Sequence, residues 1–144
     1  MIRSFIRPAI SALALSFAWS AFGAEGQWTE GFGQGNYEYF ADSKGMRLYI
    51  GCPTGAEAYA SVALLTATTQ KEVGKFAIRV AGRAYDGPFE ADSRAGASNF
   101  MSLLADLRKA DAVVVYGGKT VTFPKSNAAK VLPVYGKKFH CNLG

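Results

Sequence analysis

The sequence predicts an α+β domain with an antiparallel β-sheet of about six strands, one clear helix packed on the sheet, and one disulfide. Three observations predict this class. Short runs of alternating apolar and polar residues recur from residue 37 onward, and one later segment has the apolar spacing of an amphipathic helix. The chain also has two cysteines, which stand far apart in the sequence.

Residues 1–23 have the pattern of a secretion signal peptide. Arg3 and Arg7 precede a mostly apolar run, and Ala21 and Gly23 place small residues on the N-terminal side of a cleavage site after Gly23. An uncleaved membrane anchor is the weaker alternative, because the run falls short of the roughly 20 strongly apolar residues that span a bilayer. We therefore expect a periplasmic or secreted protein with no stable membrane insertion after signal removal.

The remainder of the chain is long enough for one domain with a modest core. Residues 24–36 contain several glycines and no regular apolar period, so we expect a flexible mature N-terminus there. Residues 37–144 are expected to form the single α+β domain.

The first strands of this domain are predicted as a hairpin. The runs "NYEYFAD" and "MRLYIGC" flank "DSKG", which has the composition of a turn. In the second run, alternation puts Met46, Leu48, Ile50 and Cys52 on one apolar face. The segment "AYASVALLTATT" is apolar on both faces and is predicted as a central strand.

The next two segments are also predicted as strands. "KFAIRVAGR" alternates, with Phe76, Ile78 and Val80 facing inward. The same alternation places basic side chains on the outward face, namely Lys75, Arg79 and Arg83. "YDGPFEAD" begins with turn residues and continues as a short edge strand.

The predicted helix is "SNFMSLLADLRKA". Ser98 is its expected N-cap, and Arg108 and Lys109 are expected in its last turn. The spacing i, i+3, i+4 and i+7 gives it an apolar face of Phe100, Leu103, Leu104 and Leu107. "DAVVVYGGKTVTFP" then reads as a hairpin turning at Gly117-Gly118, and "SNAAKVL" as a short helix ended by Pro133.

Cys52 and Cys141 are expected to form a disulfide. Export places the chain in an oxidising compartment, where two cysteines in a small domain usually pair. The bond would hold the C-terminal tail beside the "MRLYIGC" strand. The alternatives are free thiols, a nucleophilic cysteine with His140, and a metal site. A nucleophilic cysteine needs a third group that orients the histidine, and the sequence does not indicate one. A metal site needs the usual ligand spacing, which these residues lack.

The segment "LLADLRKADAVVVYGGKTVTFPKSNAAKVL" resembles the closing half of the invasion-associated locus B family and related small envelope proteins. In that family a helix leads into a paired strand, a "V-x-F-P" step and an Ala/Leu helical turn. The resemblance implies a secreted or periplasmic protein with a role in the envelope or in host interaction. It carries over no catalytic residue.

The sequence contains no Gly-x-Ser-x-Gly elbow, phosphate loop or dinucleotide fingerprint, and it has one histidine. It therefore predicts no catalytic residue, no cofactor and no metal. Glu90 and Asp92 would share one face of a strand; a solvated edge is their simplest interpretation. The alternative function is a small envelope hydrolase, whose site would use Glu90, Asp92 or His140. Nucleic acid is not expected as a partner, because export and the absence of a binding motif both argue against it.

Charge is unevenly distributed along the chain. Residues 25–42 contain four acids and no base, whereas residues 119–138 contain five lysines and no acid. We expect a non-catalytic envelope protein that binds a protein partner, as an inhibitor, an immunity protein or a secretion or host-interaction accessory. A second alternative is salt-sensitive binding to an anionic envelope polymer. The candidate binding residues are basic: Lys75, Arg79, Arg83, Lys119, Lys125, Lys130, Lys137 and Lys138.

Overall fold

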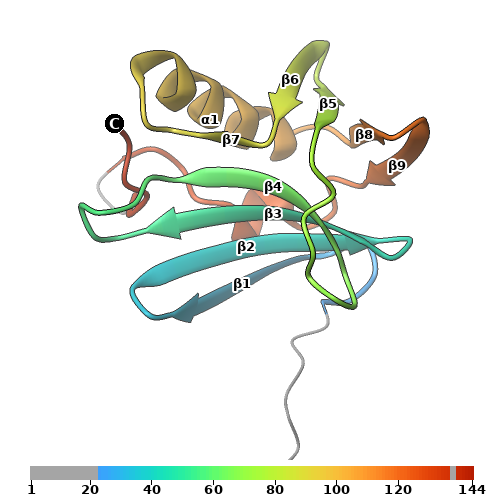
Figure 1. Cartoon of the computed structure of the whole chain (residues 1–144), viewed down its shortest axis with the longest axis horizontal. Helices are drawn as coiled ribbons and strands as arrows, with labels where there is room; N and C mark the ends of the chain where they lie inside the picture. Colours follow the sequence, from blue (N-terminus) through green and yellow to red (C-terminus); the bar gives the residue numbers. More distant parts are fainter. Residues whose placement is uncertain (1–22, 137–138) are drawn as a thin grey trace, which may run out of the picture.

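Two antiparallel sheets and a helix surround one hydrophobic core (Figure 1). The computed structural model describes residues 23–136 and 139–144, and this part of the chain contains nine strands and two helices. All but the last residue of the predicted signal peptide, and also Lys137 and Lys138, lie outside the described residues. The structure confirms a mostly antiparallel β domain with a packed helix, and it has more strands than the sequence predicts.

The larger sheet has the strand order β1-β2-β3-β4-β7. Its strands are β1 (Trp28–Gly33), β2 (Asn36–Ser43), β3 (Met46–Pro53), β4 (Ser61–Thr66) and β7 (Phe89–Glu90). The smaller sheet has the order β6-β5-β8-β9. It consists of β5 (Phe76–Val80), β6 (Arg83–Gly87), β8 (Ala112–Tyr116) and β9 (Lys119–Phe123), and the helices are α1 (Arg94–Leu107) and α2 (Ala128–Val131).

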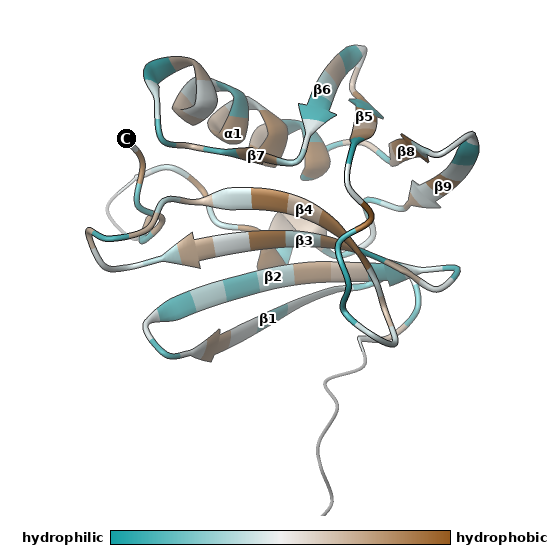
Figure 2. Ribbon diagram, in the orientation of Figure 1, coloured by the Kyte–Doolittle hydropathy of each residue, from teal (hydrophilic) through white to brown (hydrophobic). Residues whose placement is uncertain are grey.

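The core lies between the inner face of the large sheet, α1 and the inner face of the small sheet. Leu48 and Leu64 from the large sheet, Phe100 from α1, and Ile78 and Val114 from the small sheet are all buried in one cluster. In Figure 2 the most hydrophobic residues of the large sheet lie in the middle of β3 and β4. The apolar faces predicted for "MRLYIGC", "KFAIRV" and the helix are confirmed.

The predicted hairpin at "DSKG" is confirmed, as is the one at Gly117-Gly118. In the first turn Lys44 and Gly45 both have positive φ, at 47° and 78°. That conformation is the one that two-residue hairpins with a matching twist require.

One predicted strand divides into two. The chain turns at Ala81 and Gly82, with φ of 49° and 76°. The predicted strand "KFAIRVAGR" therefore contains β5, the turn and the first residue of β6. Alanine is not a usual residue for a left-handed turn position, so the sequence carried only a weak signal for this turn. The division accounts for part of the larger number of strands.

β1 occupies the segment where the sequence predicts a flexible N-terminus. It pairs with β2 along its whole length, from Trp28↔Ala41 to Gly33↔Asn36. Trp28 anchors it in the core with 3% of its surface exposed. The sequence signal was weak because Gly31 and Gly33 interrupt the apolar alternation.

α1 begins earlier than the sequence predicts. Its N-cap is Ser93, whose side chain accepts a hydrogen bond from the N–H of Gly96 at 3.0 Å, and Ser98 lies inside the helix. A Cβ on Gly96 would lie 2.4 Å from the carbonyl oxygen of Glu90, so glycine allows the first turn to pack closely on β7. Arg108 is the C-cap, so the predicted basic residues follow the last turn rather than lying within it.

Candidate functional site

An open cleft crosses the outer face of the large sheet, on the side away from the core. It consists of two adjoining hollows of about 1060 and 650 Å³, which share Tyr49, Ser61, Glu90 and Asp92. β2, β3 and β4 present alternate residues to this face, because every second side chain of a strand points away from the core. The loop at 54–60 forms a wall of the larger hollow.

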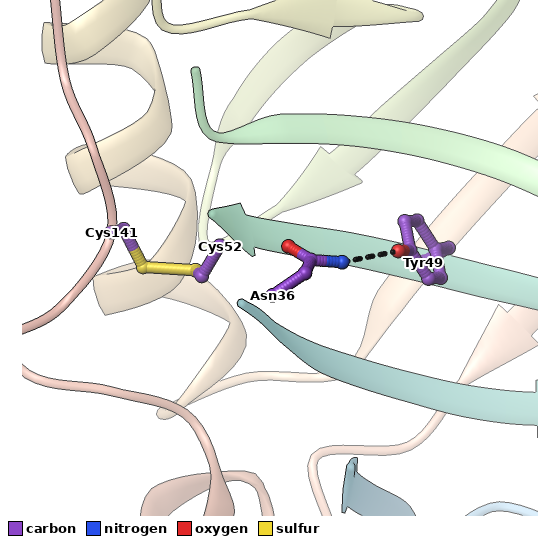
Figure 3. The surroundings of a disulfide bond; sticks show 4 residues. All are labelled: Asn36, Tyr49, Cys52 and Cys141. Atoms are coloured by element: carbon purple, nitrogen blue, oxygen red, sulfur yellow. Dashed lines mark hydrogen bonds between the residues drawn. A yellow bond between two sulfur atoms is a disulfide. The ribbon is translucent and has the colours of Figure 1, made fainter. Parts of the chain in front are cut away.

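Tyr49 is held in the cleft by a small polar network. Its hydroxyl donates to the Glu38 carboxylate at 2.9 Å, and the Asn36 side-chain amide donates to the Tyr49 oxygen at 3.2 Å. Figure 3 shows the Asn36–Tyr49 bond beside the disulfide. Burial, followed by the hydrogen bond to Glu38, raises the pKa of Tyr49 to about 12. The Tyr49 hydroxyl is therefore a neutral donor at physiological pH.

Gly51 leaves room for this tyrosine. A Cβ at residue 51 would lie 3.2 Å from Cε1 of Tyr49 and 3.0 Å from Oγ of Ser61. Both contacts are tighter than ordinary van der Waals separations. The glycine therefore lets the Tyr49 ring lie along β3 and reach Glu38.

The cleft is acidic. Its lining includes Glu57, Glu72, Glu90 and Asp92, all of them exposed, and none of the described lining residues is Lys or Arg. Carboxylates beside tyrosine rings attract ammonium and guanidinium groups, through ion pairing and through contact with the ring faces. The cleft is therefore suited to lysine or arginine side chains of a ligand.

The C-terminal tail braces the wall of the cleft. The Cys52–Cys141 disulfide is confirmed and joins the end of β3 to the tail (Figure 3). Asn142 then donates its backbone N–H to the carbonyl of Pro53 at 3.0 Å and accepts from Ala60 at 2.8 Å. The N–H of Gly144 donates to Ala91 at 2.6 Å, between the two cleft residues Glu90 and Asp92. The tail thus lies beside the end of β3, as predicted, and also reaches Ala91, which follows β7.

The residues proposed for an envelope hydrolase are only partly brought together. Glu90 and Asp92 both line the cleft. His140 lies elsewhere: its ring stacks on Tyr37, with centroids 5.5 Å apart, and it is not among the lining residues. In residues 23–136 and 139–144, no group of three or more His, Cys, Asp or Glu side chains is placed to hold a metal ion.

The predicted basic residues do not form one stripe. Arg79 pairs with Ala84 on the outward face of the small sheet, whereas Arg83 pairs with Val80, whose side chain is in the core. The predicted common face of Lys75, Arg79 and Arg83 is therefore wrong, because the turn at residues 81–82 reverses the chain. Arg83 instead reaches toward Asp106 in α1, with Nε 3.4 Å from the carboxylate.

The remaining basic residues lie in different elements. Lys119 begins β9, Lys125 follows this strand, and Lys130 is in α2, all three exposed. Lys137 and Lys138 lie outside the described residues. Binding through these residues stays a prediction.

Sequence reasoning missed the Tyr49 network and the acids Glu57 and Glu72. The network could have been predicted, because the turn at "DSKG" fixes the register that pairs Glu38 with Gly51 and Phe40 with Tyr49. Alternation then places Asn36, Glu38 and Tyr49 on one face. Glu57 stands in a loop and Glu72 in an isolated bridge to Leu65, and no spacing rule connects such residues with a strand face.

These observations define a class: a disulfide-linked, two-sheet β domain with one long helix and an open acidic cleft on its larger sheet. In the part of the chain that the structure describes, no helix is long and apolar enough to cross a membrane. The YfjT family model matches residues 26–132, so the chain belongs to the YfjT family. The match runs from just before β1 to the end of α2 and does not include the tail with Cys141. The chain matches no curated protein and no solved structure.

Proposed function

We propose that this protein is an exported, non-catalytic envelope protein that acts by binding a protein partner, and that a basic segment of the partner lies in the acidic cleft. One observation carries the proposal. The cleft is lined by Glu57, Glu72, Glu90 and Asp92, with no Lys or Arg among the described lining residues, in a chain whose net charge is +5. A local field opposite in sign to the whole chain favours a cationic ligand at this face.

The cleft offers more than charge. Tyr49 and Tyr59 line it, and the Glu38 bond fixes the Tyr49 hydroxyl before any ligand arrives. Side chains that are already ordered lose little entropy on binding, so contacts to them contribute more to affinity. Tyrosine is also among the residues that are enriched in protein interfaces.

Export is supported by the signal-like pattern of residues 1–23 and by the disulfide, since disulfides persist in oxidising compartments. Periplasmic or extracellular location is tested by fractionation of cells that express the full chain. Mass spectrometry of the recovered protein should give an N-terminus at Ala24. Recovery of an uncleaved chain with the cytoplasmic fraction would contradict this part of the proposal.

Binding is favoured over catalysis because His140 lies outside the cleft that contains Glu90 and Asp92. The remaining polar groups in the cleft are carboxylates, hydroxyls and side-chain amides. Such groups suit recognition of a cationic side chain. Hydrolysis of cell-wall or ester substrates that is lost in Glu90→Gln would favour the small envelope hydrolase instead.

The binding proposal is tested with a short lysine-rich peptide as the probe, measured by calorimetry at low and physiological salt. The cleft variant is Glu90→Gln with Asp92→Asn, and its matched control is Glu25→Gln with Asp86→Asn, which neutralises two exposed acids outside the cleft. Two lost ion pairs should weaken binding about tenfold. The control should bind like the unchanged protein, and affinity should fall as salt rises.

Equal affinity of the two double variants for the probe would overturn the cleft as the binding site. Retention of the protein on anionic envelope polymer, removed by salt and by Arg79→Ala with Lys119→Ala, would favour the polymer alternative. The native partner is then sought in envelope extract, with the cleft variant as the negative control.

A further inference from the structure

β1 forms one edge of the large sheet (Figure 1). One end of this edge is covered by a side chain, and within the described part of the chain the other end is open. An edge strand presents backbone N–H and C=O groups that have no partner strand, and proteins usually cover or interrupt such edges. In β1 only the first residue, Trp28, has its outward backbone groups covered.

The closed end is at Trp28, where Asn127 takes the place of a neighbouring strand. The N–H of Trp28 donates to Oδ1 of Asn127 at 2.7 Å, and Nδ2 of Asn127 donates to the carbonyl of Trp28 at 2.9 Å. The side-chain amide thus makes the same pair of bonds that an added strand would make. These two bonds show that the N–H and C=O groups of Trp28 point away from β2.

The open end comprises Glu30 and Phe32. Because backbone groups in an antiparallel pair alternate in direction, these two residues point their N–H and C=O groups the same way as Trp28 does, away from β2. Thr29 and Gly31 point theirs toward β2. Within the described part of the chain, the outward groups of Glu30 and Phe32 have no hydrogen-bond partner.

The side chains beside this open edge are an exposed aromatic ring and an acid. Phe32 is 63% exposed, and its ring lies 4.5 Å from that of Tyr37, which in turn stacks on His140. Glu30 is exposed and points to the same face of the strand as Phe32. Between residues 23 and 43 the charged side chains are all acidic.

We propose that the Glu30–Phe32 edge of β1 is a strand-addition site for an extended segment of another protein, in which an apolar and a basic residue stand two positions apart. The backbone of the added segment bonds to the outward groups of Glu30 and Phe32. Its apolar side chain covers the open side of the Phe32 ring, and its basic side chain pairs with Glu30. Charge complementarity to this acidic part of the chain selects the basic residue.

This inference goes beyond the proposed function, because neither Glu30 nor Phe32 lines the cleft. A partner that does not occupy the cleft can still add a strand to the edge of β1. The cleft variant Glu90→Gln with Asp92→Asn therefore serves as a control that should bind normally at β1.

The test uses the mature protein labelled with ¹⁵N and a capped, threonine-rich peptide with one valine and one lysine two positions apart. Amide signals of Glu30 and Phe32 should shift on titration and become protected from hydrogen exchange. Thr29 and Gly31, which already bond to β2, should gain little protection. A peptide with glutamate in place of lysine should bind at least about fivefold more weakly.

Two variants address the edge itself. Phe32→Pro removes an outward N–H, where proline is compatible with an edge strand, and should abolish the peptide effect while the β1–β2 amides stay protected. Glu30→Lys replaces an exposed side chain and should reverse the preference between the lysine and glutamate peptides. Peptide-induced shifts that leave Glu30 and Phe32 unchanged would overturn the proposal. So would protection of these two amides that grows with protein concentration alone, because the occupant would then be a second copy of this chain.

Discussion

The side-chain amide of Asn142 donates a hydrogen bond to the carbonyl of Ala58 at 2.7 Å. The backbone of Asn142 bonds on either side of the same loop, to Pro53 and Ala60. The third-last residue of the chain therefore holds the loop at 54–60, which forms one wall of the cleft. The tail residue that makes these bonds lies outside the residues matched by the YfjT family model.

Asn142→Ala removes the bond to Ala58 and should loosen this loop. We expect a loss of about 1 kcal/mol in the free energy of unfolding, typical of one hydrogen bond, and faster amide exchange in the loop. Binding of the lysine-rich peptide should weaken, because the wall is less ordered. The matched control is Asn99→Ala, an exposed asparagine on α1. Unchanged loop exchange in Asn142→Ala would show that the tail does not order the cleft.

Replacing either cysteine should destabilise the fold and expose the tail. The disulfide links residues 89 apart in sequence, and we expect Cys52→Ser or Cys141→Ser to lower the free energy of unfolding by about 2–4 kcal/mol. Limited proteolysis should then cut the tail first. The double variant should match either single one, because all three lose the same bond.

Thiol alkylation of the exported protein tests the bond directly. Without reductant, denatured protein should take up no label, whereas reduction should release two reactive thiols. Label on both cysteines before reduction would contradict the disulfide. Peptide binding measured before and after reduction shows whether the bond also supports the cleft.

Gly51→Ala should disturb the cleft while leaving the core in place. The added Cβ meets Tyr49 and Ser61, so the Tyr49 ring must move and its bond to Glu38 should weaken. We expect a stability loss of about 1 kcal/mol and weaker peptide binding. Gly31→Ala is the matched control, because a Cβ there meets no atom within 4 Å. Equal peptide affinity of both variants would mean that the position of Tyr49 does not matter for binding.

Much of the fold could be predicted from local sequence signals. The β2–β3 hairpin follows from alternation on both sides of a turn sequence, and the apolar face of α1 follows from its helical spacing. Where such signals were weak, the prediction differed from the structure. β1 contains two glycines, the β5–β6 turn begins with Ala81, and the first turn of α1 contains Gly96.

The candidate site could be predicted only in part. Cys52 and Cys141 were the only cysteines in a chain with an export pattern, so their pairing was a simple inference. Glu90 and Asp92 were noticed because the sequence predicts both on one face of a strand; in the structure β7 ends at Glu90, and Asp92 follows it. The cleft as a whole needs β3, β4, β7 and the loop at 54–60 to meet in space, and that arrangement comes from tertiary packing.

The buried Asp106 should be important for stability. Its side chain is 0% exposed and accepts a hydrogen bond from the Tyr85 hydroxyl at 2.6 Å, which joins β6 to the last turn of α1. Asp106→Ala leaves that hydroxyl buried without an acceptor and removes the partner of Arg83 and Lys109. We expect a loss of about 3 kcal/mol in the free energy of unfolding by denaturant titration.

Tyr85→Phe should cost less, about 1 kcal/mol, because Asp106 keeps both cationic neighbours. The double variant completes a cycle, and we expect a coupling energy of about 1 kcal/mol between the two residues. Strictly additive losses would contradict a direct Tyr85–Asp106 interaction.

Three tyrosines should make the fold sensitive to alkali. Burial is the main cause that raises the pKa of Tyr39, Tyr49 and Tyr85 to about 12, from an ordinary value of 10.0. A pKa that is higher in the folded than in the unfolded state means that folding favours the neutral hydroxyl. Their contribution to stability is therefore complete below pH 10 and is lost as the pH rises toward about 12.

The measurement is a titration of tyrosinate by ultraviolet absorbance, combined with denaturant unfolding at several alkaline pH values. Tyr49→Phe should remove part of the late absorbance change and make the fall in stability between pH 10 and about 12 shallower. Tyr135→Phe, which changes an exposed tyrosine ring, is the matched control for the loss of a hydroxyl. If Tyr49→Phe instead removed absorbance from the earliest part of the titration, the Tyr49 hydroxyl would not be held neutral by burial and Glu38.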